Sequence, residues 1–329
     1  FSWQALPLAE WLYERGIGEA RAALVSDGRI IEAAIECDDS GPRAGAVALA
    51  RLAGVLVPRL QGRVTLPGQG DALLDGIPPG ISEGASLKVR IVREAIPEPG
   101  RNKLPKAVAV LDDAEPATGP DLLARITASG HAVRHCHPHE ADLFEASGWS
   151  EVLDEAERGE IAFPGGVLRL SVTPAMTLFD VDGSLPPAPL SVAAATAVGE
   201  AIVRHGIGGS IGVDFPTMPD KTARKAASDA FDAALPQPFE RTAINGFGFM
   251  QIVRRRVRAS LPETVRGDPV GAALRAVLRR IERETGPGGQ PMRLAPALHA
   301  RLATRPDWIA ELERRTGRPF VAEEEPRSG

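Results

Sequence analysis

The stretch FPGGVLRLSVTPAMTLFDVDGS, residues 163–184, decides the fold of this protein. It reads as two apolar β-strands, and the second strand ends in Asp180 and Asp182. A long helix pattern capped by Ser191 follows, then a short apolar strand, SIGVDF, in residues 210–215, and then an amphipathic helix. This order predicts an α/β (α+β) fold in which helices cover a mixed sheet.

Asp180 and Asp214 each end a short apolar run, MTLFD and IGVD. If the two strands are neighbours, both carboxylates emerge at one edge of the sheet, where open α/β sheets place their ligands. Like charges a few ångströms apart repel each other, and a divalent cation offsets that repulsion. Mg²⁺ binds through one or two carboxylates together with waters and substrate phosphate oxygens. The sequence therefore predicts a site for Mg²⁺, or for Mn²⁺ in its place, between Asp180 and Asp214.

The composition limits the class of protein. The 329 residues, 43% of them hydrophobic, are enough for one large domain or two smaller ones. The net charge is −5, so nucleic-acid binding would depend on local basic clusters. The two cysteines are too few for a disulfide framework, and the longest apolar stretches contain Arg51 and Glu200. We therefore expect a cytoplasmic protein without a membrane-spanning segment.

Segments outside the first stretch predict further units. Residues 20–37 read as a β-hairpin around the turn SDGR. Residues 54–106 hold short strand-like pieces broken by Gly and Pro, which is typical of a small β-barrel of the OB type. The end of the chain, from residue 263, reads as charged helices. We expect four tryptophans to anchor the core: Trp3, Trp11, Trp149 and Trp308.

The motif FDVDGS, residues 179–184, resembles the opening motif of haloacid-dehalogenase-type phosphatases. In that family the first Asp, here Asp180, is the nucleophile, and the second, here Asp182, is the general acid. That motif usually opens its fold, whereas here it lies in the middle of the chain. The lysine and the acidic pair that should follow have only a weak candidate in GDP, residues 267–269.

A second resemblance covers most of the chain. Residues 163–184, 199–218 and 247–261 together resemble the catalytic core of the RNase E/G family of endoribonucleases. They are similar to its Gly-Gly strand lead, its Asp-Val-Asn motif, its Ile-Gly-Gly…Asp-Phe-x-x-Met motif and its arginine-rich segment, in the same order. The hairpin, the barrel-like segment and the C-terminal helices resemble the corresponding parts of that family.

This resemblance implies an RNase H-like/DNase I-like catalytic core with an OB-type barrel insert and a helical C-terminal tail. The implied units are residues 1–53 (hairpin and helix of the RNase H-like part), 54–106 (RNA-binding barrel), 107–165 (remainder of the RNase H-like part), 166–262 (DNase I-like catalytic domain) and 263–329 (small C-terminal domain).

The resemblance also implies roles for single residues. The family aspartates that match Asp180 and Asp214 hold one catalytic Mg²⁺, which activates a water for attack on an RNA phosphodiester. Asp182 stands where the family has an asparagine that orients the first Asp. A carboxylate there either becomes a third ligand or raises the pKa of its neighbour. Gln251 stands where the family has a glutamate.

Three departures from the family concern the substrate. The Arg-Thr-Ala-Gly segment that senses an RNA 5′-monophosphate has no counterpart. The aromatic residues that stack a base on the barrel fall near Val64 and Leu73. The cysteines of the zinc link are replaced by PETVRGDP, residues 262–269, so a homodimer of this protein would not be bridged by zinc.

Basic residues predict contacts with RNA phosphates. In helical register Arg254 and Arg258 share a face, with Arg255 beside it, and the family position assigns this segment to RNA. The alternative for these arginines is the solvated face of a helix. Lys103 and Lys106 follow the barrel and are either RNA contacts or solvated linker residues.

The histidine-rich stretch HAVRHCHPHE, residues 131–140, is a separate candidate. On a strand His135, His137 and His139 would face one side with Cys136 on the other, a spacing that suits zinc or copper. Because Pro138 interrupts a regular strand, the alternative is a polar edge strand or loop.

The sequence thus predicts a Mg²⁺-dependent endoribonuclease that cleaves single-stranded RNA, with Asp180, Asp182 and Asp214 as its catalytic residues. Two alternatives stay open. One is the phosphatase with Asp180 as nucleophile, and the other is an RNA-binding protein of the same fold that lacks the chemistry.

Overall fold

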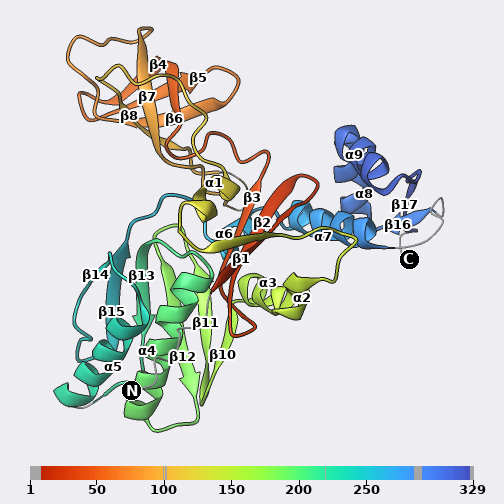
Figure 1. Cartoon of the computed structure of the whole chain (residues 1–329). Helices are drawn as coiled ribbons and strands as arrows, with labels where there is room; N and C mark the ends of the chain where they lie inside the picture. The colour runs from red at the N-terminus through yellow and green to blue at the C-terminus, as the bar shows by residue number, and fades with distance from the viewer. Residues whose placement is uncertain (1–8, 99, 101, 219, 285–290, 327–329) are drawn as a thin grey trace.

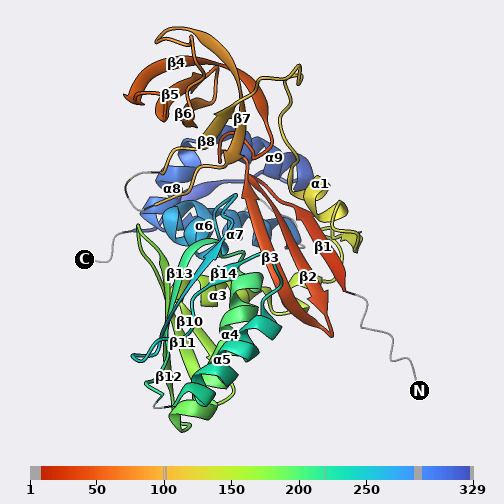
Figure 2. The same ribbon diagram turned by 90° about the vertical axis from the view of Figure 1, so that its left-hand side faces the viewer.

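The computed structural model describes residues 9–98, 100, 102–218, 220–284 and 291–326. Within this part the chain is a mixed α/β protein with nine helices, three open sheets and a closed five-stranded barrel (Figure 1). The barrel lies at one end of the molecule and a six-stranded sheet at the other (Figures 1 and 2). A four-stranded sheet and the C-terminal helices lie between them (Figure 2).

The six-stranded sheet contains the two strands predicted from residues 163–184, and the order of its strands is β10-β11-β12-β13-β15-β14. Its strands are β10 (Glu160–Phe163), β11 (Gly166–Val172), β12 (Thr177–Gly183), β13 (Gly209–Asp214), β14 (Glu240–Arg241) and β15 (Phe249–Arg254). Neighbouring strands are antiparallel except β12 and β13, which are parallel. Parallel neighbours need a crossover connection, and the helix α4 (Pro187–Arg204) provides it.

One face of this sheet is buried under α4 and α5 (Lys221–Ala234) (Figure 2). Leu168, Phe179 and Val213 point to that face and are fully buried. α4 begins at Pro187, four residues before the predicted cap, because proline is favoured in the first turn and Ser191 is buried instead of capping. The opposite face of the sheet is therefore the one available to solvent.

The four-stranded sheet contains the predicted hairpin, and its strand order is β3-β2-β1-β9. Its strands are β1 (Glu10–Arg15), β2 (Glu19–Ser26), β3 (Arg29–Cys37) and β9 (Ala132–His135). Asp27 and Gly28 connect β2 to β3 with φ of 51° and 72°. Two consecutive positive φ angles suit the twist of a two-residue hairpin, which is why Asp-Gly predicts this turn.

The closed barrel has the strand order β4-β5-β6-β8-β7. Its strands are β4 (Val47–Val57), β5 (Gln61–Leu66), β6 (Gly70–Asp75), β7 (Ser86–Arg93) and β8 (Lys106–Ala109). Alternate side chains fill the interior, among them the fully buried Leu52, Val64 and Leu74. The barrel thus starts at Val47, seven residues before the predicted boundary, because the β4 run VALAR pairs with β7.

The remaining helices lie around the four-stranded sheet and in the C-terminal part. They are α1 (Leu122–Thr127), α2 (Leu143–Ala146), α3 (Trp149–Arg158), α6 (Leu261–Gly267), α7 (Pro269–Arg283), α8 (Pro296–Ala303) and α9 (Pro306–Thr316), and a parallel pair, β16 (Met292–Leu294) and β17 (Ala322–Glu324), lies beside α8. Trp11, Trp149 and Trp308 are buried as predicted, whereas Trp3 lies outside the described residues. Within the described chain, no helix is long and apolar enough to cross a membrane.

Trp308 explains a glycine near the start of the chain. Gly18 has a φ of +76°, and a Cβ built on it would lie 2.3 Å from the Trp308 ring. Glycine is therefore required at position 18 for two reasons, its backbone conformation and the close approach of the indole. This contact packs α9 against the turn between β1 and β2.

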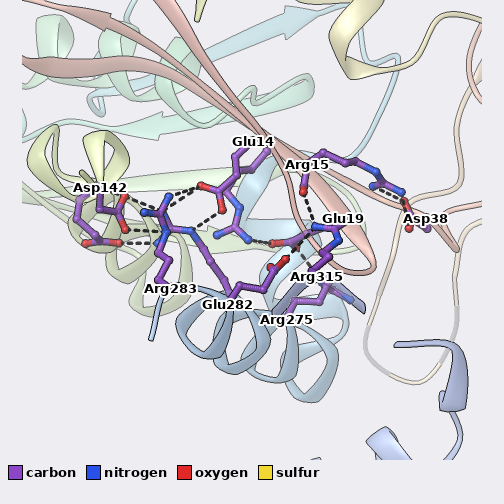
Figure 3. A network of polar contacts seen from close by, with 12 residues as sticks. Glu14, Arg15, Glu19, Asp38, Asp142, Arg275, Glu282, Arg283 and Arg315 are labelled. Atoms are coloured by element: carbon purple, nitrogen blue, oxygen red, sulfur yellow. Dashed lines mark hydrogen bonds and ion pairs between the residues drawn. The ribbon is translucent and has the colours of Figure 1, made fainter. Parts of the chain in front are cut away.

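A network of buried charges also holds α7 against β1 and β2 (Figure 3). The Glu14 carboxylate lies 3.3 Å from the Arg279 guanidinium and 3.0 Å from that of Arg283. The Glu19 carboxylate lies 2.9 Å from the Arg275 guanidinium. Both glutamate side chains are buried, and buried carboxylates need such partners to offset the loss of hydration.

Candidate active site on the open face of the six-stranded sheet

The alternation of β12 and β13 places the acidic side chains. Phe179 and Val213 point toward the helices, so Asp180 and Asp214, the next residues, point to the open face. Asp180 and Asp214 are directly paired in the register of the two parallel strands, and both are exposed. Adjacent strands are about 4.8 Å apart, so the two carboxylates are neighbours. The structure brings together the two residues that the sequence predicts at one sheet edge.

Within the described chain, the carboxylates of Asp180 and Asp214 have no ion-pair partner, although they are neighbours on the sheet. Among the described residues, no side chain forms an ion pair or a hydrogen bond with the carboxylate of Asp180 or Asp214. Two neighbouring carboxylates without a cation repel each other.

Asp182 is different, because it is already paired. Its Oδ2 accepts a hydrogen bond of 2.6 Å from Arg169 Nε, across the β11–β12 pair. Arg169 lies opposite Asp180 in the register of these strands and reaches diagonally to Asp182. The extra carboxylate that the sequence places beside Asp180 is thus balanced by an arginine on the neighbouring strand.

The donor set fits a hard divalent cation. Two carboxylates supply oxygen ligands, and Mg²⁺ needs only one or two of these when waters and substrate oxygens complete its shell. No group of three or more His, Cys, Asp or Glu side chains gathers to hold a metal in the part of the chain that the structure describes. A cation bound at Asp180 and Asp214 would therefore have two protein ligands, and water or a ligand would fill its other coordination positions.

The surface beside the carboxylates is partly apolar. A Cβ built on Gly212 would lie 2.7 Å from the Phe249 ring and 2.8 Å from Leu178 Cδ2, so these side chains cover the glycine. Phe249 is the register partner of Asp214 on β15. Gln251, further along β15, is exposed and donates a hydrogen bond of 3.4 Å to Ser210 Oγ. The open face thus offers apolar and neutral polar side chains along β15.

The arginine-rich segment lies at the other end of β15, and its predicted helix is wrong. Arg254 is the last residue of a strand, and residues 255–260 continue without helix until α6 begins. Every second side chain of β15 up to Ile252 is buried and apolar, as in a strand. The prediction of a helix for RRRVR does not take this alternation into account. Arg254 pairs with Gly209 at the opposite end of β13 from Asp214. The five-residue separation corresponds to about 17 Å along the strands.

A groove of about 470 Å³ runs along this segment. The arginines that line it are Arg125, Arg254, Arg255, Arg256 and Arg258. Burial and the nearby charge of Arg125 lower the pKa of Arg258, so like charges are crowded here. Arg125 comes from α1 and was missed, because nothing in the sequence connects it with a segment more than a hundred residues away.

Not all of these arginines are equally available. Arg256 forms an ion pair with Glu263, and Arg258 lies 3.8 Å from Glu94. Arg254 donates to the Ile207 carbonyl at 3.1 Å. Arg255 is exposed, and it has no ion-pair partner among the described residues. Arg255 is thus the arginine whose guanidinium is most available to a ligand.

The two lysines predicted to contact RNA have protein partners. Lys103 forms an ion pair of 2.7 Å with Glu98 and donates to the Pro174 carbonyl at 2.8 Å. This bond ties the connection between β7 and β8 of the barrel to the turn between β11 and β12. Lys106 lies 3.1 Å from Asp75 on the neighbouring strand. Both lysines therefore support the barrel and its connection to the sheet.

The histidine-rich stretch forms an edge strand and a loop. His135 ends β9 and contacts the edge of the Tyr13 ring, with the ring centroids 5.3 Å apart. His137 and His139 lie beyond the end of β9 and stack with their ring centroids 5.6 Å apart, and Cys136 is buried. These residues are not part of a metal-ligand group in the described structure.

No protein-family model matches this chain, and no curated protein matches it at a significant level. A function for the site on the open face is therefore supported by its residues, their geometry and the motifs that contain them.

Proposed function

We propose that this protein is a Mg²⁺-dependent endoribonuclease of the RNase E/G type that cleaves single-stranded RNA. The observation that carries the proposal is the pairing of Asp180 with Asp214 on adjacent parallel strands, on an open sheet face and without a protein cation. Each motif ends an apolar run in one of these aspartates, and the two runs are neighbouring strands of one sheet.

The wider architecture supports the same proposal. The strand order of the barrel, first-second-third-fifth-fourth, is compatible with an OB-type barrel, a fold that binds single strands. In this proposal the six-stranded sheet is the DNase I-like part, and the four-stranded sheet with its helices is the RNase H-like part. RNA contact along the barrel and the arginine groove would give an acidic protein a local grip on phosphate.

The residues of the chain have separate roles in this proposal. Asp180 and Asp214 would hold one Mg²⁺ through oxygen ligands. When bound, the metal supplies a water of lowered pKa and compensates the charge that develops on the scissile phosphate. Arg169 neutralises Asp182, so the site presents two uncompensated negative charges, which match a divalent cation. Asp182 thus positions Arg169 and the strand beside Asp180.

The arginines would bind the substrate strand at a distance from the cleaved bond. Arg255, with Arg254 and Arg258 beside it, would bind backbone phosphates. The separation of about 17 Å from the carboxylates corresponds to about five stacked nucleotides at 3.4 Å each. Cleavage would therefore need a single-stranded stretch that reaches from the groove to the open face.

The test is cleavage of an internally labelled single-stranded RNA with Mg²⁺. We expect Asp180→Asn and Asp214→Asn each to lower the rate about 100-fold or more, because each removes a metal ligand. Asp229→Asn, which changes an exposed carboxylate on α5, is the matched control and should cleave like the wild type.

Two other outcomes would support the alternatives. RNA binding that EDTA does not affect, with no cleavage by the wild type, would show an RNA-binding protein without the chemistry. Hydrolysis of small phosphomonoesters that Asp180→Asn abolishes would show the phosphatase. The engagement of Asp182 by Arg169 argues against the latter, because that reading needs Asp182 free to protonate a leaving group.

A further inference from the structure

The turn between β14 and β15 carries an exposed aromatic side chain. Phe247 is 86% exposed, and it is the only Phe, Trp or Tyr among the highly exposed large hydrophobic residues of the described chain. Singly exposed hydrophobic residues are common on protein surfaces, so the meaning of this ring depends on its position relative to the candidate site.

The backbone around Phe247 is held in place. Asn245 Oδ1 accepts hydrogen bonds from the backbone N–H groups of Phe247 and Phe249, at 2.9 and 3.1 Å. Gly248 has a φ of +97°, and a Cβ on it would lie 2.2 Å from the Phe215 carbonyl oxygen. Phe215 in turn donates its N–H to the Gly248 carbonyl at 3.1 Å. The exposed ring therefore projects from an ordered turn.

This turn lies beside the carboxylate pair. Phe249 is the register partner of Asp214, and Phe247 precedes it by two residues. The Cα atoms of Phe247 and Asp214 are consequently no more than about 13 Å apart. A nucleotide whose phosphate lies at Asp180 and Asp214 has its base within reach of this ring.

The barrel cannot provide base stacking in this protein. Residues 38–143, which include the whole barrel, contain no Phe, Trp or Tyr. Val64 is buried inside the barrel, and the exposed hydrophobic residues of the barrel strands are aliphatic. Proteins that bind single strands combine basic grooves with aromatic stacking, so a stacking residue is needed elsewhere.

We propose that Phe247 stacks on a base of the single-stranded RNA next to the cleaved phosphodiester and so positions the strand at Asp180 and Asp214. The inference builds on the proposed function and adds a substrate-positioning residue to it. Stacking is tolerant of sequence, so Phe247 would fix the position of the strand more than the identity of the base.

The first experiment measures binding of a fluorescent single-stranded RNA in EDTA, where cleavage does not occur. Phe247→Ala should weaken binding roughly 5- to 100-fold, as expected for one lost base–aromatic stack. Phe247→Trp should restore it, and Phe247→Leu, which keeps an apolar side chain without a π face, should not. Val321→Ala, an exposed aliphatic change in the C-terminal part, should bind like the wild type.

The second experiment places a single abasic nucleotide at successive positions of the RNA. An abasic nucleotide at one position near the cut should lower the affinity of the wild type. At that same position it should not lower the affinity of Phe247→Ala any further. Equal binding by all Phe247 variants would overturn the inference. So would losses from Phe247→Ala and from the abasic nucleotide that add together at every position.

The design separates this inference from the proposed function. If Phe247→Ala binds RNA like the wild type while Asp180→Asn abolishes cleavage, only the stacking is wrong. If Phe247→Ala weakens binding while no variant or wild type cleaves RNA, only the chemistry is wrong. If the wild type binds no RNA, both are wrong. If Phe247→Ala changes the oligomeric state and not RNA binding, the ring contacts protein instead.

Discussion

Two groups of carboxylates in this protein have opposite surroundings. Between α7 and the four-stranded sheet, Glu14 and Glu19 are buried and each has arginine partners (Figure 3). On the open sheet face, Asp180 and Asp214 are adjacent and exposed, and neither forms an ion pair with a side chain of the described residues. Charges that serve the fold are paired within the chain, whereas an unpaired acidic pair is what a site for an external cation requires.

The buried network should show the largest effect on stability. Arg279→Ala removes a partner of both Glu14 and Asp142, and we expect the free energy of unfolding to fall by about 3–5 kcal/mol, because buried carboxylates lose their compensation. Urea unfolding measures this. Arg280→Ala changes an exposed arginine on the same helix and should cost less than about 0.5 kcal/mol. Equal losses in both variants would contradict the structural role of the network.

A smaller, pH-dependent effect is expected where α3 meets the end of α4. Glu155 accepts from Arg204 at 3.0 Å and lies 3.0 Å from the ring of His205. Burial alone would raise the pKa of Glu155, but the hydrogen bond with His205 and the charge of Arg204 outweigh it, so its pKa is lowered.

This lowered pKa fixes the sign of the effect. The stabilisation is present above the ordinary glutamate pKa and is lost as the pH falls through the folded value. Glu155→Gln should therefore cost about 1–2 kcal/mol near pH 7, and the difference from the wild type should shrink on acidification below about pH 4.5. Thermal unfolding at several pH values measures it. A difference that grows in acid would contradict the assignment.

The arginine groove should affect RNA binding more than stability. Arg255→Ala removes an exposed guanidinium and should weaken binding of single-stranded RNA several-fold. The slope of log affinity against log salt should fall by about 0.7, the value for one phosphate contact on a single strand. Arg158→Ala, an exposed arginine on α3, is the control and should leave the slope unchanged. An unchanged slope in Arg255→Ala would place the RNA elsewhere.

The smallest effect on stability is expected at the open carboxylates. Asp180→Asn and Asp214→Asn remove a repulsion and no ion pair, so the free energy of unfolding should change by less than about 0.5 kcal/mol. Added Mg²⁺ should raise the melting temperature of the wild type and leave both variants unchanged, because only the wild type binds the ion. Strong destabilisation by either substitution would indicate a structural role.

The sequence predicts the hairpin and the central strands well, because local signals decide them. Asp27-Gly28 sets the turn, and the apolar runs before Asp180 and Asp214 set two strands that the crossover makes parallel. Other features depend on contacts between distant segments. Arg169 reaches Asp182 across a strand pair, and Arg125 joins the groove from α1. No pattern within a single segment contains that information.

The wrong prediction at RRRVR has a similar cause. Arginine is a good helix former, and a basic run that follows apolar residues reads as an amphipathic helix. Here pairing with β13 determines the conformation through Arg254, and the chain then stays irregular until Ser260 caps α6. Tertiary pairing overrides local propensity. It also places the arginines at the end of β15 that is far from the two carboxylates.

The most direct test of the central claim is a titration with Mn²⁺ followed by electron paramagnetic resonance. The claim is that Asp180 and Asp214 share one divalent cation. We expect one Mn²⁺ per chain, displaced by Mg²⁺, with binding lost in Asp180→Asn and in Asp214→Asn and retained in Asp229→Asn. Binding of the same stoichiometry and affinity in all four proteins, or no binding by the wild type, would contradict it.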